Sequence, residues 1–154
     1  MYKRQGLLHN LGILILAITF PDHFSEVYKK DYKSYLELLE TEKEMIGWDH
    51  AKIGAYYLWN HHISEEVVDS IHWHNQPSEA KASPKLASAI QIADHIVRQL
   101  GTCGMENYPV NSEDDYMKLE GWTILFGDNP EAESVKSQLK SSLERLEQTL
   151  NGVI

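Results

Sequence analysis

The sequence lacks a pair of cysteines, because Cys103 is the only cysteine among its 154 residues. No intrachain disulfide can form, which is typical of proteins from a reducing compartment. Long hydrophobic runs are also missing. The longest, residues 11–20, is about half of the ~20 residues that a membrane helix needs. A signal peptide is a poor match, because His9 and Asn10 interrupt the apolar region. We therefore expect a cytoplasmic protein that does not bind a membrane.

Basic residues are scarce relative to acidic ones. Fourteen Lys and Arg residues stand against 23 Asp and Glu residues, and the formal net charge is −9 at pH 7. A surface this negative repels phosphate backbones and anionic lipids, so we expect no nucleic-acid partner. Hydrophobic residues make up 42% of the chain, which is enough for the core of a globular protein.

Alternating Val, Ile and Thr runs, which indicate strands, are absent, and the fold class that we predict is all-α. The first helix is apolar on nearly every side and is expected to be buried. Gly47 is expected to end the second helix, and Asp49 to cap the third. The helices are expected over residues 5–19, 23–45 with a break near 31, 49–61, 64–74, 83–100 and 116–126, and from 129 onward.

The C-terminal part of the chain is organised differently. Residues 107–115 are polar and acidic and are expected to form a loop. The last helix carries a narrow apolar stripe, with steps of three and four residues, that could pack on the body of the protein or on a second copy. The stripe consists of Val135, Leu139, Leu143, Leu146, Leu150 and Val153. We expect a core over residues 1–104 and a helical extension over residues 105–154.

The histidines suggest where chemistry could lie. His72 and His74 would point about 200° apart on a helix, so they cannot both bind one ion. A metal site would take one side chain from each of several helices, and the candidate ligands are His9, His50, His74 and Asp94. The alternative is a buried polar network in which these groups satisfy each other. The remaining histidines are expected at the surface or at helix ends: His23, His61, His62, His72 and His95.

Four segments carry a family pattern. Residues 6–12 (GLLHNLG) and 48–55 (WDHAKIGA) are followed by residues 70–75 (SIHWHN) and 92–96 (IADHI). In this order and at these intervals they resemble the HD superfamily, and among its members the HDOD proteins, the HD-related output domains of bacterial signalling. The resemblance implies an HD-domain-like helical bundle. In catalytic relatives, matching positions hold metal ions that activate water for attack on a phosphoester.

The departures from the family pattern indicate a loss of hydrolysis. Asn10 stands where the HD aspartate is expected, and its neutral carbonyl oxygen cannot bridge ions as a carboxylate can. Ile13 replaces the lysine that follows the motif in HD-GYP phosphodiesterases, and Asn75 replaces the second histidine of a His-His pair. The helices that normally precede the motif are also expected to be absent.

The resemblance and its departures together imply a non-catalytic bacterial signalling module of HDOD type that acts by binding a protein partner. We expect no catalytic residue and no cofactor, with one weakly bound divalent transition metal on the four candidate ligands as the alternative. The alternative function is a divergent metal-dependent phosphohydrolase. A homodimer is a further option, since the uncovered apolar faces of Leu7, Leu8, Leu11 and Ile15 would favour self-association.

Overall fold

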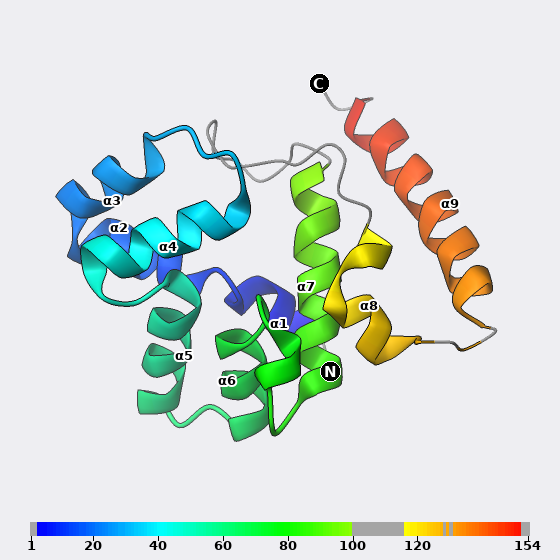
Figure 1. The fold of residues 1–154 in the computed structure, drawn as a ribbon, viewed down its shortest axis with the longest axis horizontal. Coiled ribbons are helices and arrows are strands. Elements are labelled where there is room, and N and C mark those ends of the chain that lie inside the picture. Colours follow the sequence, from blue (N-terminus) through cyan, green and yellow to red (C-terminus); the bar gives the residue numbers. More distant parts are fainter. Residues whose placement is uncertain (1–2, 100–115, 128, 130, 152–154) are drawn as a thin grey trace.

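A computed structural model of the chain describes residues 3–99, 116–127, 129 and 131–151, and within these residues the fold is all-α, as predicted. Helix α7 runs through the middle, with α1 to α6 on one side and α8 and α9 on the other (Figure 1). None of the described helices is long and apolar enough to cross a membrane. The elements are α1 (Lys3–Leu8), α2 (Leu11–Thr19), α3 (Pro21–Tyr28), α4 (Tyr35–Ile46), α5 (His50–Asn60), α6 (Glu65–His72), η1 (Pro77–Glu79), α7 (Pro84–Gln99), η2 (Tyr116–Lys118), α8 (Glu120–Leu125) and α9 (Ala132–Asn151).

Local signals fix the connection between α4 and α5. Gly47 ends α4 in the left-handed conformation, with φ of 87°, which a residue without a Cβ adopts at no steric cost. The Asp49 side chain then accepts a hydrogen bond from the backbone N–H of Lys52, at 2.9 Å, and so caps α5. Both sequence predictions are confirmed. The connection matters because it places His50 in the first turn of α5.

The prediction of one buried helix over residues 5–19 is wrong. The chain breaks at His9 and Asn10 into α1 and α2, and the break directs His9 toward the interior. Leu7 and Ile18 are each 83% exposed and Leu14 is 61% exposed. The apolar residues on both sides of His9 and Asn10 predicted one helix. The break was missed because His9 makes its key contact with Asp94, which lies far along the chain.

Helices α2 and α5 meet backbone to backbone. A Cβ atom on Gly12 would lie 1.8 Å from the carbonyl oxygen of His50, and a Cβ atom on Gly54 would lie 3.0 Å from the backbone nitrogen of Gly12. Only glycine allows two helices to approach this closely at these positions. The contact holds the start of α5, and with it His50, against the start of α2.

The C-terminal elements pack on α7. Trp122 of α8 is buried with Ile92 and Ile96 of α7, and the stripe residues Val135, Leu139 and Leu143 of α9 pack against this cluster. Leu146 is 45% exposed. The side chains of Leu150 and Val153 are not among those that the structure describes, and the loop predicted over residues 107–115 lies outside the described residues. The single helix predicted over residues 116–126 is η2 followed by α8.

The Gln91 side chain adds a polar link between α7, α8 and the turn after α6. Its Nε2 donates to the carbonyl oxygen of Asn75 at 3.1 Å, and its Oε1 accepts from the backbone N–H of Gly121 at 2.9 Å. The C-terminal elements are therefore connected to the segment that carries His74.

Candidate functional site

The break between α1 and α2 places His9 against Asp94 of α7. Nε2 of His9 lies 3.1 Å from Oδ1 of Asp94, and Nδ1 lies 2.7 Å from the carbonyl oxygen of Gly6. Oδ2 of Asp94 lies 3.0 Å from Nη2 of Arg98, as an ion pair without the alignment of a hydrogen bond. The two carboxylate oxygens of Asp94 thus face different partners, Oδ1 facing His9 and Oδ2 facing Arg98.

The start of α5 places His50 against Glu42 of α4. Nδ1 of His50 lies 2.8 Å from Oε2 and 3.0 Å from Oε1 of Glu42, and the backbone N–H of His50 donates to Oε2 at 2.9 Å. Nε2 of His50 lies 3.1 Å from the hydroxyl of Tyr35. The hydroxyl of Tyr28 donates to Oε1 of Glu42. Since Glu42 and His50 are both 0% exposed, these bonds offset the cost of burying the carboxylate.

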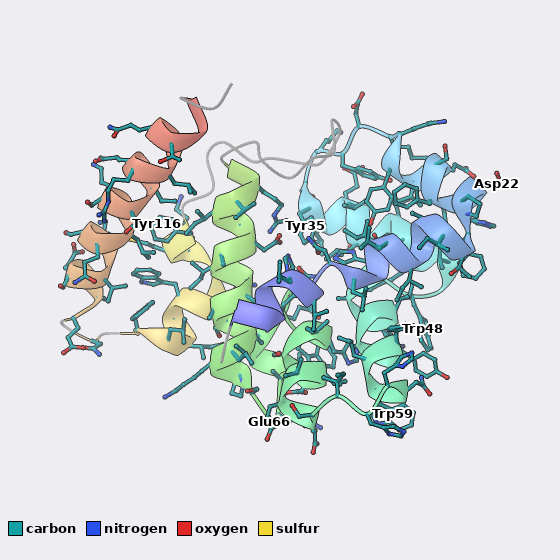
Figure 2. The ribbon with its side chains drawn as sticks, turned by 180° about the vertical axis from the view of Figure 1, so that it is seen from behind. Asp22, Tyr35, Trp48, Trp59, Glu66 and Tyr116 are labelled. Atoms are coloured by element: carbon teal, nitrogen blue, oxygen red, sulfur yellow. The ribbon has the colours of Figure 1, made fainter. Side chains whose placement is uncertain are left out.

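Arg98 and Tyr35 connect the His9–Asp94 pair with the His50–Glu42 pair. The guanidinium of Arg98 lies over the ring of Tyr35, 3.8 Å from its centroid, a cation–π contact that is favourable when water is excluded. Tyr35 lies between α4 and α7 in Figure 2. The polar network, which we define as His9, Asp94, Arg98, Tyr35, His50 and Glu42, therefore spans α4, α5, α7 and the turn after α1.

His74 occupies the turn that follows α6 and is completely buried. Its Nδ1–H donates to the carbonyl oxygen of Ile71 at 2.7 Å, while Nε2 has no hydrogen-bond partner. The ring centroid of His74 lies 5.4 Å from that of His9 and 5.9 Å from that of His50. The fold thus brings the four candidate ligands together, and of the His72/His74 pair it selects His74.

The pKa values of His74 and of its neighbours in the polar network are shifted in different directions. Burial opposes a charge on His50, but the adjacent Glu42 carboxylate outweighs this and raises the pKa of His50. Burial and the nearby His50 lower the pKa of His74 to about 3. For Asp94, burial is outweighed by the hydrogen bond from His9 and the charge of Arg98, and the pKa falls to about 2. At neutral pH Asp94 is ionised and His74 is neutral.

These groups, as placed, do not fit a metal ion. Both nitrogens of His50 face protein partners, as do both nitrogens of His9, and Arg98 already compensates the charge of Asp94. Only His74 offers an unshared nitrogen lone pair. Within the described part of the chain, no group of three His, Cys, Asp or Glu side chains is arranged to hold an ion. The geometry corresponds to the polar-network alternative, and metal binding by the four residues stays a prediction.

Two buried atoms without a hydrogen-bond partner lie at positions that depart from the HD pattern. Oδ1 of Asn10 and Nδ2 of Asn75 are buried without a hydrogen-bond partner, like Nε2 of His74. Such atoms are uncommon in a folded core and cost free energy. The two asparagines therefore add little to the stability of the network.

Sequence reasoning missed Glu42, Arg98 and Tyr35. A signal existed for Glu42, because it follows Leu38 by four residues and Leu39 by three, on the buried face of α4. Arg98 likewise follows Asp94 by one turn of α7. His95, expected at the surface or a helix end, is buried at 8% exposure within α7, so that expectation is wrong.

The family model of the HDOD domain matches residues 4–77. This segment belongs to the HDOD family. The HDOD resemblance is therefore confirmed for residues 4–77, which include three of the four motifs, and an HDOD domain is a signalling-associated, HD-like module. The matched segment holds His9, His50 and His74, whereas Asp94 and Arg98 lie beyond it on α7. No curated protein and no solved structure matches the chain.

Proposed function

We propose that this HDOD module is a non-catalytic signalling component in the bacterial cytoplasm that acts by binding a protein partner. The observation that carries the proposal is the state of His50. Its Nδ1 lies against the Glu42 carboxylate and its Nε2 against the Tyr35 hydroxyl, at 2.8 and 3.1 Å. A histidine engaged in this way has no lone pair to offer an ion or a substrate.

The remaining groups support the same proposal. Hydrolysis of a phosphoester by a metal-activated water needs several anionic or imidazole ligands that converge on the ion. Asn10 brings no charge, and the charge of Asp94 is compensated by Arg98 at 3.0 Å. The polar network serves to hold α4, α5 and α7 in fixed positions, and thereby shapes the outer surfaces of these helices for recognition.

A second copy of the chain is the alternative partner. Of the residues expected to be uncovered, Leu7 is exposed, whereas Leu8 and Leu11 pack against the core cluster of α5 and α6. Leu14 and Ile18, one turn apart on α2, are exposed as well, and uncovered apolar side chains mark interaction surfaces. Light scattering over a wide concentration range tests this option. A mass that rises with concentration, and that returns to the monomer value in Leu14→Asp/Ile18→Asp, is the result expected for a homodimer.

The non-catalytic proposal is tested by hydrolysis assays. We expect no turnover of bis(p-nitrophenyl) phosphate or of cyclic dinucleotides by the purified protein with added Mn²⁺, Fe²⁺ or Ni²⁺. Turnover that disappears in His50→Ala would overturn the proposal. The Lys52→Ala variant is the matched control, because it changes an exposed residue on the same helix.

The second candidate function is a divergent metal-dependent phosphohydrolase. One observation favours it, since Nε2 of His74 has an unshared lone pair in the buried site. This function requires His9, His50 and Asp94 to exchange their present partners for an ion. Near-stoichiometric transition metal in the purified protein, lost in His74→Ala, would support it.

A further inference from the structure

A groove lined by aromatic side chains runs along the outer side of α5 and α6. Two adjoining hollows share Trp59, Val68 and His72 and therefore form one continuous surface. Figure 2 shows Trp48 and Trp59 along the outer side of α5. The first hollow extends toward Trp48 and Lys52, and the second toward Glu65 and Asp69.

The aromatic side chains in this groove are unusually exposed. Trp59 is 63% exposed and Tyr56 is 54% exposed. Their rings adjoin, with centroids 6.3 Å apart, and the Trp48 centroid lies 5.4 Å from that of Tyr56. Large rigid aromatic side chains are enriched at protein interfaces because they bury much area at little entropic cost. Trp48, Tyr56 and Trp59 together thus have the composition of a protein-binding surface.

The two ends of the groove differ in charge. At one end, Nζ of Lys52 lies 4.6 Å from the centroid of the Trp48 ring. At the other end, Glu65 and Asp69 line the groove beside Trp59. Oδ2 of Asp69 accepts hydrogen bonds from the backbone N–H groups of Ala82 and Ser83, at 2.8 and 3.1 Å, which holds this carboxylate in place.

We propose that the groove docks an extended segment of the partner protein, whose arginine stacks on Trp59 and faces Glu65 and Asp69. Arginine is the best complement, because its planar guanidinium stacks on an indole and pairs with carboxylates at the same time. The net charge of −9 attracts a cationic segment from a distance. This inference rests on the proposed partner-binding function and adds the docking surface and the partner's chemistry.

The test uses three blocked nine-residue peptides of alternating Leu and Ser that differ at one central position, which is Arg, citrulline or Glu. Binding is measured by isothermal titration and mapped by amide chemical shifts in ¹⁵N-labelled protein. We expect saturable binding of the Arg peptide, weaker binding of the citrulline peptide and none of the Glu peptide. The shifts are expected on α5 and α6.

Matched variants locate the contact. Trp59→Ala is expected to weaken binding of the Arg peptide by about tenfold, and Glu65→Gln by about threefold. Tyr57→Ala alters an aromatic side chain on the same helix that is 44% exposed but does not line the groove, and Glu66→Gln removes a neighbouring charge. Both controls should leave binding unchanged.

Several outcomes would overturn the inference. Equal binding of the Arg and Glu peptides would mean that the groove takes any apolar segment, and shifts confined to α1 and α2 would place the contact elsewhere. Absence of binding by the Arg peptide, or a Trp59→Ala variant that binds as wild type, would also reject it. None of these results involves hydrolysis, so the non-catalytic proposal fails only in its own assay.

Discussion

Nδ1 of His50 lies 2.8 Å from Oε2 of Glu42, and neither side chain is exposed to solvent. Burial costs both groups their hydration, and their mutual attraction offsets that cost only while both are present. Replacing either side chain is therefore expected to lower the stability of the folded protein.

Glu42→Gln is expected to lower the free energy of unfolding by about 3–5 kcal/mol, because it leaves His50 beside a neutral amide in the core. Urea denaturation followed by circular dichroism measures the change. Glu44→Gln alters an exposed residue of the same helix and is expected to change stability by less than about 0.5 kcal/mol. Equal effects of the two substitutions would contradict the buried ion pair.

Gly12→Ala is expected to be strongly destabilising, by about 3 kcal/mol or more, because the new Cβ would lie 1.8 Å from the His50 carbonyl oxygen and force α2 away from α5. Thermal unfolding measures the effect. Gly6→Ala is the matched control, since no atom lies within 4 Å of a Cβ at that position. If both variants melt like the wild type, the backbone contact is not as close as described.

Stability should fall as the pH drops below about 6.5. The pKa of His74 is lowered from 6.5 to about 3 in the folded protein, so in this window the unfolded chain binds a proton that the folded core excludes. The free energy of unfolding then decreases by up to about 5 kcal/mol between pH 6.5 and 3. Asp94, whose pKa is lowered to about 2, loses its own contribution only as the pH falls below its unfolded value of 3.8.

His50 acts in the opposite sense. Its pKa is raised, so its stabilising effect is present below 6.5 and is lost as the pH rises through its folded pKa. Urea titrations at pH 7, 6, 5 and 4 should therefore show a flatter profile for His74→Gln than for the wild type. His23→Gln, which alters an exposed histidine of α3, is the control. An unchanged slope in His74→Gln would assign the acid sensitivity to another group.

Metal content follows from the bonds of the network. Because His9, His50 and Asp94 face protein partners, we expect less than about 0.1 equivalent of transition metal after purification without chelator. Plasma mass spectrometry measures the content. A metal ion that binds the folded protein must stabilise it. Because we expect no ion to bind, added Ni²⁺ should leave the melting temperature unchanged. A rise that is absent in His74→Ala would reject this expectation.

The sequence predicted the parts of the fold that depend on local chemistry. Gly47 and Asp49 act through their own backbone and the next turn, so their roles were readable from position alone. The grouping of His9, His50, His74 and Asp94 was also predicted, from the placement of the histidines on separate helices. Glu42 lies on the buried face of α4, but it was missed because the pattern of α4 does not show that His50 of α5 lies beside it.

The polar network also has a consequence for the order of folding. Glu42 and His50 are 8 residues apart, whereas His9 and Asp94 are 85 residues apart. Closing the longer loop costs about 2 kcal/mol more chain entropy. We therefore expect the contact between Glu42 and His50 to form in the folding transition state, and the contact between His9 and Asp94 to form afterwards. Substitutions of Glu42 should then slow folding, while Asp94→Asn should mainly speed unfolding.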